Sequence, residues 1–483
     1  MIPVLLALAS VSATTGWTAE PRAEFGPLWQ EFPLTLKLGE RMEAAGPFYW
    51  HETTPESSLT AYGPFYVRYD QPGAEYSQTE VLYPLFSLDR IGMQYRWNVM
   101  QLFSGSGGKN LDDSGVKRTT LFPLFFKQTS TGGTNDYWAL MPFYGHLHHR
   151  LFRDDMRFIM LPLYVQTRKK DVVTDNYLMP FFHIRSGGAQ GWQFWPLYGE
   201  ESRTPLSRTN DITEELEVVP GHEKRFALWP IWFDDRLGLG TTNAVTNHVL
   251  LPIYSLSRSG ARDQSTYLFP FFSHTVDREN HFDEWGCPWP VIGWANGEGK
   301  HARRFWPLWG KASNAKLESD FVAWPLYTHQ LLTSAPLERE QYRSLFYLYR
   351  DVRETDTTTG KSLRWNGMWP LFIHRTDREG RERWQFPALL ESVVPTSSAV
   401  DRGWSTFWSV YRWEKNPVTG AASQSFLWNL YRHDQTSKES RTSMLFGAIR
   451  THKTESGRHW SILGLGTAGK PSAEPKPVAT HAK

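Results

Sequence analysis

The chain has 483 residues and a formal net charge of +2, which balances 52 Lys and Arg against 50 Asp and Glu. This balance excludes the basic surface of a nucleic-acid-binding protein, and we expect no nucleic-acid partner. Phe, Trp and Tyr make up 15% of the residues, which excludes disorder throughout the chain. The single cysteine, Cys287, excludes intrachain disulfides and multi-cysteine metal sites.

The chain begins with an uncharged apolar run over residues 2–13, followed by small residues. Runs of this kind are typical of secretory signal peptides, although no Lys or Arg precedes this one. We predict a signal peptide over residues 1–19, with a buried N-terminal strand or helix as the alternative. No later run reaches the length that a transmembrane helix needs.

A four-residue motif recurs along the chain: an apolar residue or Gly, then Pro, then an aliphatic residue or Phe, then usually an aromatic residue. The prolines of these tetrads are Pro27, Pro47, Pro64, Pro84, Pro123, Pro142, Pro162, Pro180, Pro196, Pro230, Pro252, Pro270, Pro290, Pro307, Pro325 and Pro370. Copies without proline lie at 100–103, 346–349, 408–411, 428–431 and 446–449. The usual interval is about 20 residues, which indicates a repeat protein.

The tetrads lie between polar segments rich in turn residues. Short apolar runs bounded by turns are typical of strands, and a proline every 20 or so residues disfavours helices. We therefore predict an all-β fold, an antiparallel up-and-down meander of about 22–24 strands with one tetrad in each. The prolines pose a difficulty, because a proline inside a central strand removes a ladder hydrogen bond. Either each strand bulges at its proline or a strand begins there.

Both faces of several expected strands are apolar at the centre, as in 155–169 and 248–256. This pattern favours a large closed β-barrel with an aromatic belt. The alternative is a soluble propeller-like or solenoid-like array whose two faces are covered. The apolar stretches are short for a barrel, because a tilted membrane-spanning strand needs about 9–11 residues. We predict a single repetitive β domain over residues 20–468 and a disordered tail over residues 469–483.

The densest histidine cluster contains His146 and His148, which would share one face of a strand, a spacing that can hold a metal. The only carboxylates nearby are Asp154 and Asp155, past an expected turn. We interpret the cluster as a solvated strand end and predict no metal site. Cys287 lies between aromatic residues, and we predict a buried, inert thiol.

The longest interval between tetrads contains the segment 199–222, whose acidic residues 214, 215 and 217 could bind a cation in a loop. We interpret them as solvated side chains. Basic residues that follow the tetrads could line a pore, stack on aromatic rings or pair with acids. They are Arg68, Lys127, Arg168, Arg185, Arg350, Arg375, Arg412, Arg432 and Arg450. We expect most of the repeated tryptophans to be buried, and exposed ones would suit sugar rings.

These features predict an exported β-barrel of the cell envelope, a passive pore or structural component of an outer membrane whose partner is membrane lipid. The alternative is a soluble periplasmic or secreted β-repeat protein that binds polysaccharide or another envelope protein. No catalytic residue, cofactor or metal ligand is assigned, and we do not expect an enzyme.

Overall fold

The computed structural model describes residues 29–109, 115–133, 135–209, 216–455, 457–462 and 465–466. The predicted signal peptide over residues 1–19 and the predicted tail over residues 469–483 lie outside these residues. The described part of the chain is almost entirely β-sheet.

The first strands are β1 (Gln30–Pro33), β2 (Glu40–Ala44), β3 (Tyr49–Thr53), β4 (Ser58–Tyr62), β5 (Tyr66–Gln71), β6 (Tyr76–Val81), β7 (Phe86–Ile91), β8 (Gln94–Val99), β9 (Phe103–Gly107), β10 (Lys117–Leu121), β11 (Phe125–Thr129) and β12 (Tyr137–Leu140). Two 3-10 turns, η2 (Gly46–Phe48) and η3 (Pro72–Ala74), lie among them. The next strands are β13 (Tyr144–Arg150), β14 (Arg153–Ile159), β15 (Tyr164–Lys169), β16 (Val172–Tyr177), β17 (Phe182–Gly187), β18 (Gln190–Phe194), β19 (Tyr198–Arg203), β20 (Leu206–Thr209), β21 (Leu216–Val219), β22 (Gly221–Ala227) and β23 (Trp232–Leu239).

The third group is β24 (Val245–Leu250), β25 (Tyr254–Ser259), β26 (Arg262–Tyr267), β27 (Phe272–Asp277), β28 (Phe282–Gly286), β29 (Ile292–Gly297), β30 (His301–Phe305), β31 (Trp309–Ser313), β32 (Leu317–Val322), β33 (Tyr327–Ser334), β34 (Leu337–Ser344), β35 (Tyr349–Asp356), β36 (Ser362–Met368), β37 (Phe372–Thr376) and β38 (Glu382–Phe386). Two short helices follow, α1 (Ser398–Gly403) and α2 (Ser405–Trp408). The last strands are β39 (Tyr411–Asn416), β40 (Ala421–Phe426), β41 (Tyr431–Gln435), β42 (Ser440–Met444), β43 (Ile449–Thr454), β44 (Gly457–Ile462) and β45 (Leu465–Gly466).

Within the described residues, 43 strands form one antiparallel sheet in which each strand pairs with its neighbours in sequence. The exception is the hairpin β20–β21, a separate two-stranded sheet that the main ladder bypasses by pairing β19 with β22. The expected all-β antiparallel meander is therefore confirmed. The expected number of 22–24 strands is wrong, because each repeat of about 20 residues contains a whole hairpin rather than one strand.

The expected position of the tetrads inside strands is also wrong, because they form the turns between strands. The tetrad at 161–164 shows the arrangement: β14 ends at Ile159, the turn contains Pro162, and β15 begins at Tyr164. The X-Pro bond at Pro162 is cis, as it is in most of the other proline tetrads. The turn position removes the conflict between proline and the ladder, because no ladder N–H is needed there.

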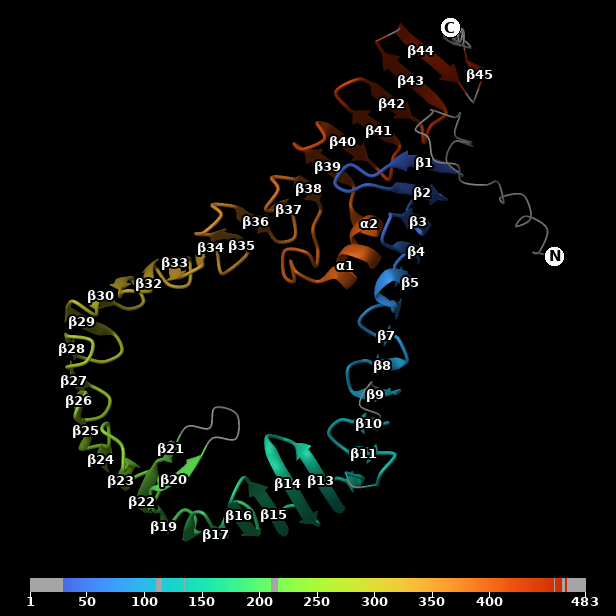
Figure 1. The fold of residues 1–483 in the computed structure, drawn as a ribbon. Helices are drawn as coiled ribbons and strands as arrows, with labels where there is room; N and C mark the ends of the chain where they lie inside the picture. Colours follow the sequence, from blue (N-terminus) through green and yellow to red (C-terminus); the bar gives the residue numbers. More distant parts are fainter. Residues whose placement is uncertain are drawn as a thin grey trace, which may run out of the picture.

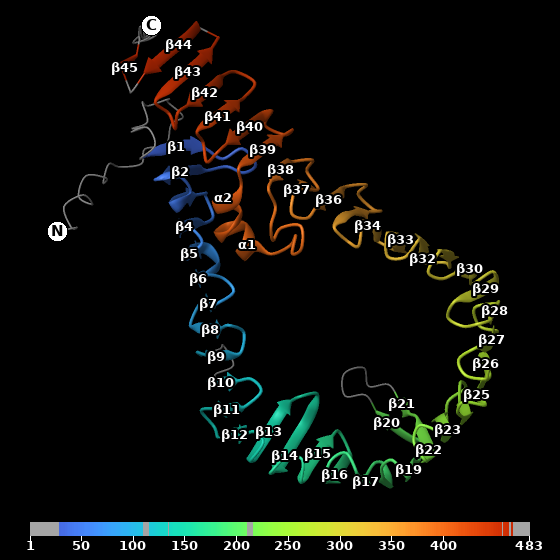
Figure 2. The same ribbon diagram turned by 180° about the vertical axis from the view of Figure 1, so that it is seen from behind.

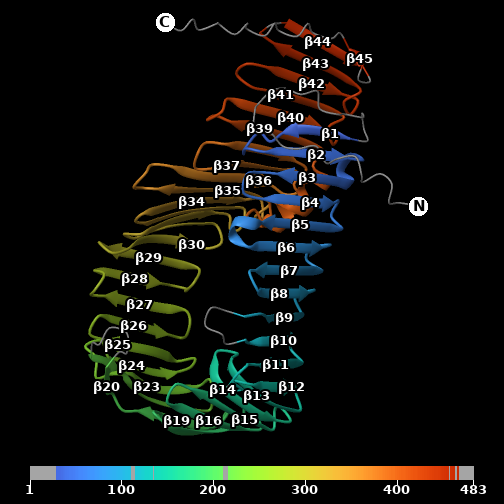
Figure 3. The ribbon, with the colours of Figure 1, turned by 45° about the vertical axis from the view of Figure 1, so that its right-hand side comes forward.

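The sheet curves into a ring (Figure 1), and the same ring seen from behind has α1 and α2 on its inner side, beside β5 (Figure 2). Strands β39 to β41 lie next to β1 and β2, and the last strands continue past this junction (Figure 3). The sheet forms a single layer around most of the ring (Figure 3).

The predicted closure into a barrel is not made by backbone hydrogen bonds. Among the described residues, β1 pairs only with β2 and β45 pairs only with β44, so the two ends of the ladder stay unjoined. Instead, the N-terminal strands β1 and β2 meet strands β39 to β41 through side chains, at a junction that we call the seam. Nor is the sheet divided into the blades of a propeller, because one ladder continues throughout.

The helices inside the ring identify the inner face of the sheet. Arg402 of α1 donates to Gln78 at 2.5 Å, and its guanidinium lies 4.8 Å from the ring of Tyr69. Side chains alternate between the two faces of a strand, and residues paired across neighbouring strands lie on the same face. The pairing register therefore identifies the inner-facing residues of every strand in the sheet. The two buried apolar clusters lie on it. They are Phe126, Tyr137, Ala139, Leu147, Phe158 and Val165, and Trp50, Leu59, Ala61 and Val67.

Candidate functional site

One edge of the ring is lined by the tetrads. In a meander, all turns from an even-numbered strand to the next odd-numbered strand lie along the same edge, and these are the tetrad turns. We call this edge the proline rim. It comprises 45–48, 63–65, 82–85, 100–102, 122–124, 141–143, 160–163, 178–181, 195–197, 228–231, 251–253, 268–271, 287–291, 306–308, 323–326, 345–348, 369–371, 427–430 and 445–448.

The backbone of the proline rim is hydrogen-bonded from turn to turn. In the turn 160–163, Leu163 N donates to Met160 O at 2.8 Å, and the first two N–H groups donate to carbonyls of the turn 141–143 at 2.5 and 2.6 Å. Pro162 has no N–H. The prolyl carbonyl in turn accepts from the next turn, in the pairs Pro162–Met179, Pro196–Trp229, Pro252–Phe269 and Pro307–Trp324. These turns can therefore leave water without unpaired donors.

The side chains of the proline rim are apolar and exposed. Phe346 is 65% exposed, Met100 61% and Phe143 59%. The exposed tryptophans of the rim are Trp229, Trp289, Trp306, Trp324 and Trp369. The expectation that repeated tryptophans are buried is thus wrong for these positions, because the tetrads are at an edge and no second layer covers them. Exposed apolar surfaces of this kind are typical of sites that contact lipid or another protein.

The outer face of the sheet continues the apolar surface for one row of residues next to the rim. Directly opposite pairs form this row, among them Tyr62–Tyr66, Val81–Phe86, Leu121–Phe125, Leu140–Tyr144, Ile159–Tyr164, Tyr177–Phe182, Phe194–Tyr198, Leu250–Tyr254, Tyr267–Phe272, Phe305–Trp309, Val322–Tyr327, Phe386–Tyr411 and Phe426–Tyr431. The inner face beside the rim is mixed, with polar or small residues such as Ser87, Asn98, Ser104 and Thr120 in one sector and the buried Phe126 and Phe158 in the next. At this level the outer face is therefore more uniformly apolar than the inner face.

The next row of the outer face, two residues further from the rim, carries amphipathic rings. Its tryptophans are Trp97, Trp138, Trp192, Trp285, Trp294, Trp384, Trp413 and Trp460. Its histidines, with their partners, are His51–Thr60, His146–Asp155, His248–Asp234, His274–Asp283, His329–Asp320, His374–Glu382 and His433–Thr442. Polarity thus increases with distance from the rim. The turns are apolar, whereas the indole and imidazole side chains of this row combine an apolar body with a polar atom.

The opposite edge of the ring is polar. Its turns include 54–57, 130–133, 170–171, 240–244, 278–281, 314–316, 357–361, 377–381 and 436–439, which are rich in Gly, Asn, Asp, Ser, Thr and charged residues. The main apolar exceptions are Leu38, Met93, Leu151, Phe152 and Val418. The separate hairpin β20–β21 also projects from this edge. The two edges of one sheet therefore differ in chemistry around most of the ring.

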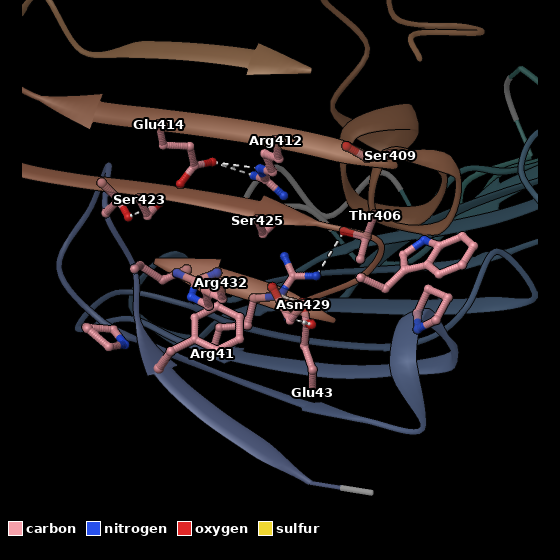
Figure 4. A pocket seen from close by; sticks show the side chains of 16 residues that line it. Arg41, Glu43, Thr406, Ser409, Arg412, Glu414, Ser423, Ser425, Asn429 and Arg432 are labelled. Atoms are coloured by element: carbon pink, nitrogen blue, oxygen red, sulfur yellow. Dashed lines mark hydrogen bonds and ion pairs between the residues drawn. The ribbon is translucent and has the colours of Figure 1, made fainter. Parts of the chain in front are cut away.

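The seam joins residues that are more than 300 positions apart (Figure 4). Thr35 donates to Ser423 at 2.7 Å, and Asn416 donates to the carbonyl of Thr35 at 3.1 Å. From the N-terminal side, Arg41 donates to Thr406 at 2.9 Å. The cavity between these residues has a volume of only about 50 Å³, room for a water or two. The seam is therefore a packed junction and not a ligand pocket.

Buried charges line the seam on both sides. Arg41 pairs with Glu43 at 2.7 Å and with Glu52 at 2.9 Å. Glu414 accepts from Arg412 at 2.8 Å and from Arg383 at 3.0 Å. Burial alone would raise the pKa of Glu414, but these guanidinium groups and that of Arg432 outweigh it and lower the pKa to about 2. Glu414 is therefore ionised at neutral pH, paired with cations on its own and neighbouring strands.

The helices at the seam are anchored by Glu391, which is fully buried. Its carboxylate accepts from Gln385 at 2.7 Å, from Ser405 at 2.5 Å and from the indole N–H of Trp408 at 2.8 Å. The indole of Trp404 reaches across the seam and donates to the carbonyl of Tyr83 at 2.9 Å. The helical segment thus links β38 to the N-terminal strands.

The structure places the two histidines of the sequence cluster as expected on one face of a strand. His146 and His148 lie on the outer face of β13 and are partly buried. The expected turn before Asp154 and Asp155 is tight, and it brings Asp155 directly opposite His148. The three side chains therefore form a cluster.

Two other sequence expectations have different outcomes. Cys287 is exposed, contrary to the predicted buried thiol, because its flanking aromatic residues belong to a turn of the proline rim. In the segment 199–222, β19 continues the main sheet and β20–β21 form the extra hairpin. Residues 214 and 215 lie outside the described residues, so the expectation of solvated acids there stays a prediction.

Of the three roles that the sequence suggested for the basic residues after the tetrads, pairing with acids is the most frequent in the structure. The pairs are Arg68–Asp70, Arg185–Glu201, Arg375–Asp401, Arg412–Glu414 and Arg432–Asp434. Two also lie against aromatic rings, Arg350 over Trp365 at 5.0 Å and Arg432 over Phe32 at 3.6 Å. The basic residues are therefore mainly structural in this arrangement.

No protein-family model matches the chain, and a search of curated proteins finds no significant match. Within the described residues, none of the helices has the length and apolar character needed to cross a membrane.

Proposed function

We propose that the protein is an exported structural ring of the cell envelope that seats its proline rim in a lipid membrane, with an outer membrane as the expected location. The observation that carries the proposal is the rim itself: exposed apolar side chains stand on turns whose N–H groups are paired laterally. Backbone at membrane depth must have its polar groups satisfied within the protein. A rim with this property is suited to lipid.

The graded outer face sets the depth of insertion. The apolar row and the row of Trp and His are separated by two residues, or about 7 Å at the rise of a strand. Trp and Tyr gather where membrane meets water, because their rings combine an apolar body with a polar tip. Most strands have only four to eight residues, fewer than the about 9–11 of a tilted membrane-spanning strand. The ring therefore enters one leaflet.

Flotation with lipid vesicles tests the proposal. Each large apolar side chain that enters lipid contributes on the order of 1.5–3 kcal/mol when fully buried. The wild-type protein is expected to float with the vesicles. The triple variant Trp229→Glu, Trp306→Glu and Trp324→Glu is expected to lose at least ten-fold in the bound fraction, because three charges then face the acyl chains. Leakage of an entrapped dye would indicate a passive pore, and retention a structural ring.

A matched control places three new carboxylates on the opposite edge: Thr242→Glu, Thr358→Glu and Ser437→Glu, all in exposed turns. This variant should float like the wild type, and circular dichroism should show the same β-sheet content in all three proteins. Wild-type protein that stays in solution with neutral and anionic vesicles alike would contradict the proposal. Binding to envelope polysaccharide or an envelope protein in that case would support the soluble alternative.

A further inference from the structure

The outer face of β13 and β14 brings two imidazoles and a carboxylate together. His148 is paired in register with Asp155, and His146 lies two residues along the same face. His146 Nε2 is 2.5 Å from Asp155 Oδ1, and His148 Nδ1 is 3.3 Å from the same oxygen. One ligand atom of each residue lies within 4.8 Å of the others, in a group that is unique among the described residues.

The distances suit a tetrahedral ion. Ligand atoms bound at about 2.0–2.1 Å in tetrahedral geometry are about 3.3 Å apart. The separation of His148 Nδ1 and Asp155 Oδ1 already has this value. The His146–Asp155 pair is a hydrogen bond and would open by about 0.8 Å to reach it. That change is small for side chains that are about a quarter exposed and face outward.

The chemistry of the three side chains also suits a metal. Two imidazoles and one carboxylate are a ligand set typical of zinc and of neighbouring divalent transition metals. The fourth position would face solvent, because the cluster lies on the outer face of the sheet.

The one opposing feature is Arg157. Its Nε lies 3.4 Å from His146 Nε2 and 3.7 Å from Asp155 Oδ2, so its charge competes with a cation. The side chain is 61% exposed, and a long exposed arginine can swing into water at little cost. Arg157 therefore provides a test, because a metal site gains from its removal whereas an ordinary ion-pair cluster does not.

We propose that His146, His148 and Asp155 bind a divalent transition-metal ion of the zinc class, with one coordination position open to solvent. The other histidines of the same row have one or two Thr, Asp or Glu partners, and none has a second histidine two residues away on its strand. The site is independent of membrane binding and adds a function to one sector of the ring.

Equilibrium dialysis against Zn²⁺, and the visible spectrum with Co²⁺, test the proposal on the untagged full chain. Wild-type protein is expected to bind one ion per chain and to give the Co²⁺ absorption of a four-coordinate site. His146→Ala, His148→Gln and Asp155→Asn should each weaken binding more than ten-fold. Arg157→Gln should bind at least three-fold more tightly, because a competing charge is removed.

The matched control is His274→Ala, which removes a histidine of the same row that pairs with Asp283 at 2.7 Å. This variant should bind Zn²⁺ like the wild type. The proposal is overturned if the wild type binds no ion at 100 μM Zn²⁺, or if the double variant His146→Ala, His148→Gln keeps wild-type binding. Circular dichroism of each variant confirms folding, and Arg157→Gln gives a gain of binding that misfolding cannot imitate.

Discussion

The long run of hairpins from β6 to β37, which we call the arc, and the seam are stabilised in opposite ways. In the arc, neighbouring strands share backbone hydrogen bonds, and the buried side chains are mainly apolar. At the seam the ladder stops, and the contacts across it come from side chains, such as Thr35 with Ser423 and Arg41 with Thr406, while buried ion pairs lie on either side. The comparison shows that a regular ladder tolerates change at single side chains, whereas a junction without a ladder depends on a few of them.

The largest difference is expected for a carboxylate removed from each region. Glu414→Ala leaves the buried charges of Arg412 and Arg383 without their partner, and breaking a buried ion pair costs about 3–5 kcal/mol. Glu284→Ala in the arc removes one partly buried pair with Lys300 at 2.6 Å and leaves an amine that can turn toward water, so we expect a loss of about 1 kcal/mol. Urea unfolding of the two variants measures the difference.

Small-angle X-ray scattering in native buffer extends this test to shape. Glu414→Ala should enlarge the radius of gyration as the ring opens, while Glu284→Ala should leave it unchanged. Equal losses of stability in the two variants would contradict the distinction between arc and seam.

Acid should act on the seam first. The pKa of Glu414 is about 2 in the folded protein, below its ordinary value of 4.5. Between these values the unfolded chain binds more protons, so the stabilisation is complete above about pH 4.5 and is lost as the pH falls toward 2. Unfolding free energies measured at pH 5, 4 and 3 should decline less steeply in Glu414→Gln than in the wild type. Identical slopes would show that Glu414 does not carry the effect.

A covalent bond across the seam should make it resemble the arc. The hydroxyls of Thr35 and Ser423 are 2.7 Å apart and separated by 388 positions in sequence. The pair Thr35→Cys and Ser423→Cys, in a Cys287→Ser background, should form a disulfide that stabilises the protein by about 2–4 kcal/mol. Thermal unfolding with and without reductant gives the difference, and no change on reduction would mean that the seam is not the weak point.

The smallest effect is expected for a single hydrogen bond at the seam. Thr406→Val removes the acceptor of Arg41 Nη2 but leaves that guanidinium paired with Glu43 and Glu52. We expect a loss of about 1 kcal/mol, since one hydrogen bond is removed without stranding a buried charge. Thr174→Val, on the inner face of β16 in the arc, should cost less. A reversed order would indicate that the seam tolerates defects.

Much of the arc is predictable from the sequence, because the tetrads repeat at hairpin spacing. The error lay in equating an apolar run with a buried strand, as in 161–164, whereas here the apolar residues form an exposed turn. The proline was the signal, since it fits a turn better than a central strand. The seam could not be predicted, because contacts such as Thr35–Ser423 join distant positions that no local pattern links.

The candidate sites were only partly predictable, for a related reason. The rim and its outer row follow from the tetrads once these are recognised as turns. An aromatic-x-His triplet then recurs, at 49–51, 144–146, 272–274, 327–329, 372–374 and 431–433, and was a usable sign of the histidine row. The partnership of His148 with Asp155 needed the register of β13 and β14, which depends on a tight turn at Leu151 and Phe152.

The missing ladder at the seam has a consequence for how such a chain can change in length. In a closed barrel, strand number, tilt and stagger are coupled, so a new strand disturbs the whole cylinder. Here a hairpin could be duplicated or lost anywhere in the arc, and the circumference would change by about 10 Å, the width of two strands. Because a hairpin adds two strands, every insertion would keep its proline turn on the same edge of the ring. The diameter of the ring can therefore change by one hairpin at a time.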